Sequence, residues 1–328
     1  MSTTSTSNTH ASANTTFSVF IDGQAGTTGL GIADRLAGHS RIRIVEIADA
    51  DRKSAAAKSE ILSAVDLTIL CLPDAAAKET VALADALPGG GPIIVDASTA
   101  HRVAEGWDYG FAELSAGQAA AIKASRRIAN PGCYPTGAIA LIRPLIEAGI
   151  ITPDHAITIN AVSGYSGGGR QMIEAYESGT APPFVLYGLG LSHKHLPELQ
   201  KFSGLSAPPI FVPSVGNFAQ GMLVSIPLHL GALAKTSTPD DLRACLDAYF
   251  TRTAVGSTPL VSVPDHDHPA YSGGRLAADD LAETNAMELF VFGNRETGQA
   301  VLVARLDNLG KGASGAAVQN MELALGLA

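Results

Sequence analysis

FSVFIDGQAGTTG, residues 17–29, is the stretch that decides the fold. It begins as an apolar strand, meets glycines at positions 23, 26 and 29, and runs on into a helix-like segment. A glycine-rich turn between a strand and a helix lets the backbone approach a pyrophosphate and aims the helix N-terminus at it. The spacing is G-x-x-G-x-x-G rather than the usual G-x-G-x-x-G, so a purely structural turn is the alternative. Its setting favours a dinucleotide site formed by Gly23, Gly26, Thr27, Thr28 and Gly29.

Strand-like and helix-like segments alternate around this turn, from Phe17 to about Asn130. Short apolar runs such as LTILCL, residues 67–72, are typical of strands buried on both faces, which predicts a parallel sheet covered by helices. After about residue 155 strands such as AVLVARLDN, residues 300–308, have fewer helices between them, which predicts a mostly antiparallel sheet. One helix there has Thr238 as its expected cap, and a last helix is expected from about residue 312.

Composition narrows the class of protein. The 328 residues carry a net charge of −9 with no Lys/Arg-rich run, which argues against electrostatic binding to nucleic acid. No apolar run reaches the length of a membrane-spanning helix. The three cysteines suit neither a disulfide framework nor zinc spacing, so we expect a reducing compartment, the cytoplasm, and no metal. We expect a disordered Ser/Thr/Asn-rich tail at 1–16, a dinucleotide-binding domain at 17–132 and 312–328, and a catalytic and oligomerisation domain at 133–311.

NPGCYPTGA, residues 130–138, places Cys133 where a helix is about to begin. The apolar segment after it predicts a helix that runs until Pro144. The free N–H groups and dipole of a helix start favour a thiolate and lower the pKa of its thiol. The alternative is a small buried side chain. Cys71, within a strand, and Cys245, on the apolar face of a helix, are expected in the core, so Cys133 is the one candidate nucleophile.

Two further motifs leave alternatives open. In SHKHLPE, residues 192–198, two histidines stand two positions apart, and this spacing fits metal ligands, surface residues or a catalytic pair. Asp49 and Asp51 follow the second strand, where a ribose-binding acid favours NAD. Arg52 and Lys53 come next, and a basic residue favours NADP, so these residues alone do not decide between the cofactors. DHDHP, residues 265–269, is interpreted as an exposed loop rather than a metal site.

Taken together, the motifs resemble the short form of the N-acetyl-γ-glutamyl-phosphate reductase family, which is related to aspartate-semialdehyde dehydrogenase. The resemblance spans residues 17–328 and rests on GQAGTTG, DASTAHR, NPGCYPTGA, SGYSGGGR, SHKHLPE and DNLGKGASGAAVQN. It implies a glyceraldehyde-3-phosphate-dehydrogenase-like fold, with a Rossmann-type domain and an α+β domain. It also implies NADPH-dependent reduction of N-acetyl-γ-glutamyl phosphate to N-acetylglutamate 5-semialdehyde in arginine biosynthesis, by a homo-oligomer that is a dimer or tetramer.

The resemblance assigns roles to individual residues. It implies that Cys133 is the nucleophile that forms a thioester, that His195 is the acid/base group, and that Glu198 belongs to the catalytic set. The residues that it implies for the substrate are Ser98, Arg102, Asn130, Ser163 and His193, with Ser98 and Arg102 handling phosphate. The residues that it implies for the cofactor, besides the turn, are Ser166, Gly167, Asn308 and Gly312. Because it also implies NADPH, we expect Arg52 or Lys53, from the stretch after the second strand, to contact the 2′-phosphate. The plainer alternatives are a helix cap and a solvated charge in DASTAHR, a flexible turn in SGYSGGGR, and a connecting loop in DNLGKGASG.

Three rival functions share part of this pattern. An aspartate-semialdehyde dehydrogenase would have the same cysteine, histidine and cofactor turn. A catalytically silent dinucleotide sensor would not need Cys133 and His195. A cysteine hydrolase would not need the GQAGTTG turn.

Overall fold

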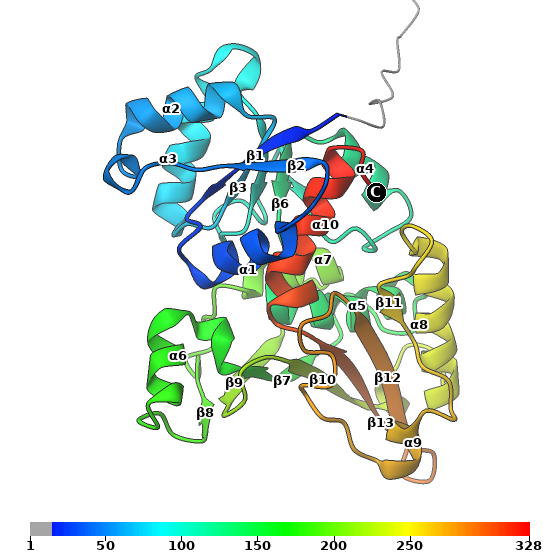
Figure 1. The fold of residues 1–328 in the computed structure, drawn as a ribbon. Helices are drawn as coiled ribbons and strands as arrows, with labels where there is room; N and C mark the ends of the chain where they lie inside the picture. The colour runs from blue at the N-terminus through cyan, green and yellow to red at the C-terminus, as the bar shows by residue number, and fades with distance from the viewer. Residues whose placement is uncertain (1–14) are drawn as a thin grey trace, which may run out of the picture.

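The structure of the protein is a computed structural model that describes residues 15–328. The tail predicted at residues 1–16 lies outside this range except for its last two residues. Within residues 15–328, no helix is both long enough and apolar enough to cross a membrane. Two sheets lie one above the other in Figure 1, with helices α5, α7 and α10 near their junction.

The first sheet is parallel throughout, in the order β2-β1-β3-β4-β6-β5. Its strands are β1 (Phe17–Asp22), β2 (Ile42–Val45), β3 (Leu67–Leu70), β4 (Ile93–Asp96), β5 (Asp108–Tyr109) and β6 (Arg127–Ala129). Its helices are α1 (Thr27–Leu36), α2 (Ala55–Ala64), α3 (Asp74–Asp85), α4 (Gln118–Ala124) and α10 (Gly315–Ala324). The parallel pairing confirms the sheet predicted from the alternating segments.

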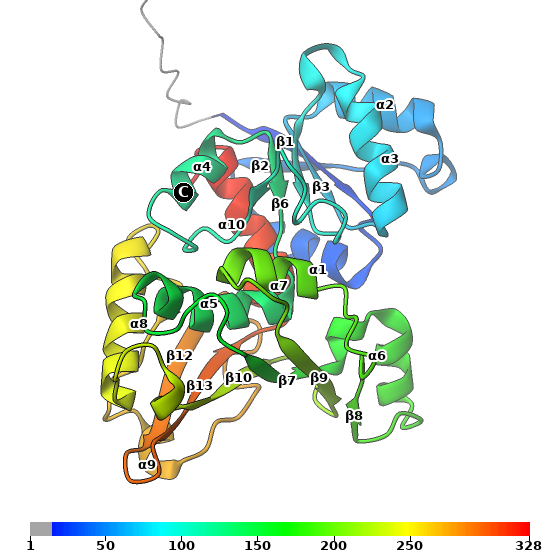
Figure 2. The same cartoon turned by 180° about the vertical axis from the view of Figure 1, so that it is seen from behind.

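Both faces of this sheet are buried, as its continuous apolar strands require. Ile69 and Leu70 are neighbours on β3, so they point to opposite faces, and both are 0% exposed. Ile69 belongs to a cluster with Ile32 of α1 and Met321 of α10, while Leu70 belongs to a cluster with Val81 of α3. Figure 2 shows the same arrangement from behind, with α2 and α3 on one side of the sheet and α10 on the other.

The second sheet is mostly antiparallel, in the order β11-β12-β13-β10-β7-β9-β8, with parallel pairs only at β11–β12 and β7–β9. Its strands are β7 (Thr158–Gly164), β8 (Phe184–Leu186), β9 (Ile210–Gly216), β10 (Met222–His229), β11 (Val261–Ser262), β12 (Met287–Asn294) and β13 (Gln299–Leu306). The remaining helices are α5 (Cys133–Glu147), α6 (Arg170–Glu177), α7 (Leu196–Ser203), α8 (Pro239–Thr253) and α9 (Pro269–Gly273). Short 3-10 turns are η1 (Asp49–Asp51), η2 (Pro88–Gly90), η3 (Tyr165–Gly168) and η4 (Leu230–Ala232), and η5 (Gly310–Ser314) is a π-helical turn.

The two faces of the second sheet differ. Met222, Val224 and Ile226 alternate along β10 toward the core that α5 and α8 complete. Leu223 points to the opposite face, beside a hollow of about 700 Å³ that Phe184 of β8 also lines. Phe184 is 55% exposed, so this second face presents apolar side chains to the surface.

Three helix boundaries were predicted from the sequence, and the structure confirms one of them. Thr238 caps α8 as predicted, since its Oγ1 accepts a hydrogen bond from the Asp241 N–H at 3.2 Å. The prediction that α5 ends before Pro144 is wrong: the Ala148 N–H donates to the Pro144 carbonyl at 3.0 Å, and Leu145 is buried in the core, so one more turn is retained. The last helix begins at Gly315 rather than near residue 312, because η5 precedes it.

Candidate active site

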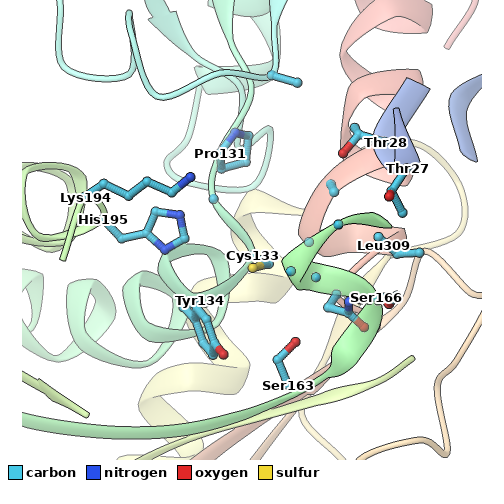
Figure 3. A pocket seen from close by; sticks show the side chains of 18 of the residues that line it. Thr27, Thr28, Pro131, Cys133, Tyr134, Ser163, Ser166, Lys194, His195 and Leu309 are labelled. Carbon is cyan, nitrogen blue, oxygen red and sulfur yellow. Dashed lines mark hydrogen bonds between the residues drawn. The ribbon is translucent and has the colours of Figure 1, made fainter. Parts of the chain in front are cut away.

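A cavity of about 490 Å³ lies where the first sheet meets the second. The carboxyl ends of parallel strands are where open α/β sheets bind ligands, and the turns after β1, β3 and β6 all reach this cavity. Thr27 and Thr28, at the start of α1, lie on one side of it in Figure 3, and Lys194 and His195 lie on the other. Cys133 lies between these two sides.

Most of the predicted site residues meet in this one cavity. Those that line it are Gly26, Thr27, Thr28, Arg102, Asn130, Cys133, Ser163, Ser166, Gly167, His193, His195, Asn308 and Gly312. Gly23, Gly29, Arg52, Lys53, Ser98 and Glu198 are not among its lining residues. Cys71 directly follows β3, is half-buried and packs against the core of the first sheet as expected, and it also lines the cavity. Cys245 is half-buried and packs against the core.

The glycine-rich turn has the geometry that an anion site needs. Gly23 has a φ of +93°, and a Cβ there would lie 2.3 Å from the Cys71 carbonyl oxygen. A Cβ on Gly29 would lie 2.5 Å from the Gly23 carbonyl oxygen, so both positions require glycine. Gly26 is the N-cap of α1 and provides no side chain to occupy the first N–H groups of the helix. These N–H groups at the cavity fit the pyrophosphate of a dinucleotide.

A neighbouring hollow of about 360 Å³ continues from this turn along β1 and β2. Arg52 lines it and pairs with Asp49 at 2.6 Å. Lys58 lines it too and pairs with Asp22 at 2.7 Å. Lys53 is exposed and lies outside it, so the structure separates the two basic residues that the sequence places side by side.

Cys133 is the first residue of α5, with Gly132 as its N-cap. Burial raises the pKa of the Cys133 thiol to about 11, and the Tyr134 N–H and the Arg102 charge lower it only in part. The helix start thus lowers this pKa as predicted, but burial of the thiolate outweighs it, so the expected net lowering is wrong. The thiol is protonated at neutral pH and needs a base.

His195 is the base that the geometry offers. Its ring is buried, and Figure 3 shows it pointing toward Cys133. Burial, and then the nearby charge of Arg102, hold the pKa of His195 well below 6.5, so the ring is neutral at neutral pH. Its Nδ1 atom has no hydrogen-bond partner among residues 15–328. A neutral imidazole with an unpaired nitrogen can take up a proton from a thiol.

Glu198 lies beneath the cavity and holds its parts together. Its Oε1 accepts a hydrogen bond from Arg102 Nη1 at 2.5 Å, and its Oε2 accepts from Tyr109 Oη at 2.8 Å and from the Gly132 N–H at 3.1 Å. A Cβ on Gly132 would lie 2.8 Å from both Glu198 Oε1 and His195 Nε2, so only glycine fits at this junction. Glu198 is therefore placed to position its neighbours rather than to touch a ligand.

Arg102 and Ser98, both expected to handle phosphate, are placed differently. Arg102 lines the cavity and donates through Nε to the Asn130 carbonyl at 3.1 Å and through Nη2 to the Ala97 carbonyl at 3.3 Å. With the bond to Glu198 these contacts use three of its five N–H groups, so others remain for an anion. The Ser98 hydroxyl donates to Asp96 Oδ2 at 2.8 Å and lies outside the cavity.

Among the lining residues that the sequence analysis did not assign to the site are three with polar side chains, Tyr134, Tyr187 and Lys194. Tyr187 Oη donates to Tyr134 Oη at 3.2 Å, and Tyr134 Oη donates to the Ser214 carbonyl at 2.9 Å. Lys194 is exposed at the cavity between His193 and His195, and Figure 3 shows it extending beside the His195 ring. The available signal was adjacency, since Tyr134 follows Cys133 and Lys194 separates the two histidines.

The wall near α6 is tied to the end of β13 and to the glycine-rich turn. Asn308 Nδ2 donates to Ser166 Oγ at 2.9 Å, and Asn308 Oδ1 accepts from the Gly221 N–H at 2.9 Å. Arg170, the first residue of α6, donates from Nη2 to the Ala25 carbonyl of the turn at 3.0 Å. Residues far apart in the chain thus close one cavity.

No group of three potential metal-ligating side chains occurs among residues 15–328. In the DHDHP segment Asp265 pairs with Arg243 at 2.6 Å, and His268 Nδ1 accepts from the Ala270 N–H at 3.2 Å. Arg243 belongs to α8, and Ala270 belongs to the first turn of α9.

Residues 133–308 match the family model described as semialdehyde dehydrogenase, dimerisation domain. The chain is 50% identical over 312 residues to a protein of Rhizobium leguminosarum bv. trifolii named N-acetyl-gamma-glutamyl-phosphate reductase, covering 94% of this chain and 98% of that one. It is 49% identical over 314 residues to a protein of Rhizobium meliloti with the same name, again covering 94% and 98%.

Solved structures with the same fold are more distant in sequence. Aspartate semialdehyde dehydrogenase II from Vibrio cholerae superimposes with a TM-score of 0.68 at 15% identity, over 94% of this chain and 98% of that one. Aspartate semialdehyde dehydrogenase with NADP from Candida albicans gives a TM-score of 0.63 at 13% identity, over 94% and 98%. They confirm the expected two-domain fold class.

The raised pKa of Cys133 predicts how its thiol reacts with iodoacetamide. Only the thiolate reacts, so the alkylation rate should rise about tenfold per pH unit from pH 8 to 10, without a plateau. Mass spectrometry of the labelled peptides should show Cys133 labelled ahead of Cys71, whose pKa burial raises to about 12. A rate that levels off by pH 8 would contradict the assignment. Cys133→Ser is the control for labelling at other sites.

Proposed function

The chain belongs to the family of N-acetyl-γ-glutamyl-phosphate reductases, and we propose that this cavity reduces N-acetyl-γ-glutamyl phosphate to N-acetylglutamate 5-semialdehyde with release of phosphate. One observation carries the proposal: a single cavity brings together Cys133, the neutral His195, the cation Arg102 and the N-terminus of α1. The curated relatives, identical to the chain at about half of the aligned positions, support the substrate.

The charges of the cavity suit a substrate with a phosphate and a carboxylate. Arg102 and Lys194 line it, and guanidinium and ammonium groups are the usual partners of such anions. Glu198 is 1% exposed and already accepts hydrogen bonds from Arg102, Tyr109 and Gly132, so its charge is compensated away from the substrate. We assign Arg102 to the phosphate and Lys194 to one of the two anionic groups.

The reaction begins with the Cys133 thiol and His195. His195 takes the thiol proton, and the thiolate attacks the acyl carbon of the substrate. The bond from that carbon to the phosphate oxygen breaks, leaving a thioester on Cys133, and the proton on His195 passes to the departing phosphate. Backbone N–H groups at the start of α5 are placed to stabilise the oxygen that becomes negative.

A nicotinamide cofactor, when bound, supplies a hydride to the thioester carbon. The carbon–sulfur bond then breaks, the aldehyde leaves, and the Cys133 thiolate takes up a proton that comes from solvent through His195. His195 lies on one side of Cys133 and Ser166 on the other (Figure 3), and Gly167 and Asn308 line the same cavity.

For the cofactor we propose NADPH in preference to NADH. The glycine-rich turn and the free N-terminus of α1 suit the pyrophosphate, and Arg52 lines the neighbouring hollow where the adenosine ribose would lie. The Arg52 guanidinium can bind a 2′-phosphate by donating two parallel hydrogen bonds. Lys53 lies outside this hollow, so we assign the phosphate to Arg52.

We propose that the protein is a homo-oligomer, a dimer or tetramer, in the cytoplasm. The family model for residues 133–308 is that of a dimerisation domain. The exposed apolar face of the second sheet, with Phe184 and Leu186, is the surface that we assign to this contact. The three cysteines are free, which suits a reducing compartment.

The activity can be tested with purified protein, NADPH and N-acetyl-γ-glutamyl phosphate. We expect one phosphate released for each NADPH oxidised, and loss of this activity in Cys133→Ser. Cys245→Ser is the matched control and should keep it, since Cys245 lies outside the cavity. Faster reduction of β-aspartyl phosphate than of the N-acetylated substrate would favour an aspartate-semialdehyde dehydrogenase instead.

The two histidines should differ in their effects. His195→Asn removes the base, so kcat should fall about 10²- to 10⁴-fold with a small change in KM. His193 is half-buried on the cavity wall, so His193→Asn should act mainly on KM. Because the pKa of His195 lies well below 6.5, wild-type kcat should stay level from pH 8 to 6.5. Exchanged effects of the two substitutions would reverse the assigned roles.

Arg52 and Lys53 form a matched pair for the cofactor. Arg52→Ala should raise KM for NADPH about tenfold or more, because it removes a charge-assisted contact to the 2′-phosphate, and should leave NADH nearly unchanged. Lys53→Ala should leave both cofactors nearly unchanged. Initial rates with each cofactor decide this, and an equal loss for NADPH and NADH in Arg52→Ala would mean that Arg52 does not contact the phosphate.

A further inference from the structure

A buried ion pair lies behind Cys133, outside the cavity. Lys311 and Glu113 are each 1% exposed, and Lys311 Nζ lies 2.9 Å from Glu113 Oε1 and 2.8 Å from Oε2. The third contact of the ammonium group is Gln319 Oε1 at 2.7 Å. Gln319 Nε2 donates in turn to Glu113 Oε1 at 3.0 Å. The ammonium group thus has three close oxygen partners in the interior.

Lys311 belongs to the π-helical turn η5, which touches the nucleophile. The next residue, Gly312, packs so closely that a Cβ there would lie 2.8 Å from Cys133 Cβ. Another contact of the turn runs through Ala313, whose carbonyl accepts a hydrogen bond from Asn130 Nδ2 at 3.0 Å. A π-helical turn is uncommon in proteins. Because η5 packs against Cys133, the contacts that hold η5 in place also fix the position of the Cys133 backbone.

Glu113 connects the same turn to the opposite side of the site. It follows β5, and Tyr109 of β5 donates to the carboxylate of Glu198. Between them, the Gly110 carbonyl accepts from Asn320 Nδ2 at 2.8 Å, and that amide also donates to Asn130 Oδ1 at 2.9 Å. The ion pair therefore joins the turn behind the cysteine to the segment that anchors Glu198.

Stability alone gives a weak reason for this arrangement. Burying two charges costs solvation, and apolar residues of similar size often leave a protein as stable as a buried pair does. The ion pair instead holds η5 in one position, because the Lys311 ammonium group with three hydrogen-bond partners restrains the backbone of the turn more strictly than an apolar side chain would.

We propose that Lys311, Glu113 and Gln319 are positioning residues that hold η5 against Cys133 and keep the thiol buried in its place for attack. This inference rests on the proposed role of Cys133 as the nucleophile. None of the three lines the cavity, so they act only through η5 and the segment after β5.

The test is the triple variant Lys311→Met, Glu113→Leu, Gln319→Leu. It replaces all three polar side chains together, so that no unpaired charge remains in the interior. We expect a melting temperature within a few degrees of wild type. The kcat should fall about 10²-fold, because small displacements of reacting groups have effects of this size. KM should stay within about threefold, and Cys133 alkylation at pH 8 should become about tenfold faster, since a less buried thiol has a lower pKa.

The matched control is Arg127→Met with Asp85→Leu, an ion pair of 2.5 Å at the start of β6, the end of that strand opposite the cavity. At the same fraction of folded protein, this double variant should have the kcat and the Cys133 alkylation rate of the wild type. A folded triple variant with wild-type kcat and wild-type alkylation would overturn the proposal. Alkylation needs no substrate, so it still tests the proposal if the protein does not reduce N-acetyl-γ-glutamyl phosphate.

Gln319→Met decides the matter if the triple variant does not fold. It removes one partner of the ammonium group and keeps the ion pair, so the protein should stay folded. A fall in kcat of about threefold to tenfold at unchanged KM, with faster alkylation of Cys133, supports the proposal. An unchanged kcat and an unchanged alkylation profile overturn it.

Discussion

The arrangement of the site depends on the hydrogen bonds that the buried Glu198 carboxylate accepts. It accepts hydrogen bonds from Arg102 after β4, from Tyr109 of β5 and from the N–H of Gly132, just before Cys133. Three segments of the first domain are thus fixed by one side chain of α7, three residues beyond His195. A charge buried in this way is costly unless it is fully paired, and the arginine together with two further donors pairs it. His195, Arg102 and the start of the helix that carries Cys133 are therefore all positioned by this one carboxylate.

Burial sets the protonation states of the site together. The same exclusion of water that raises the pKa of Cys133 lowers that of His195, so the resting pair is a neutral thiol and a neutral imidazole. A thiolate at Cys133 would therefore have to form by proton transfer inside the cavity rather than by ionisation in solvent.

Much of the fold could be predicted from the sequence, because local patterns encode it. Runs such as LTILCL gave the parallel sheet, and Thr238 with Pro239 gave the start of α8. Most of the site residues predicted from the motifs also meet in one cavity, since many of them stand near the end of a strand or the start of a helix. The sequence could not show that burial outweighs the helix start in setting the pKa of Cys133. Nor could it show that Ser98 donates a hydrogen bond to Asp96, or that Arg52 lines the hollow beside the glycine-rich turn while Lys53 lies outside it. Each of these depends on which distant segments pack around the side chain.

The place of α10 has a consequence for how the protein forms during synthesis. Ala317 and Met321 complete the apolar cluster on one face of the first sheet, whose strands lie within residues 17–129. A nascent chain that has produced those strands still has an apolar surface where α10 will pack, and its cysteine still lacks the backing of η5. Domains near the N-terminus usually fold as they emerge. Here one face of the first sheet is completed only by residues near the end of the chain, so the core on that face can close only after α10 has been synthesised.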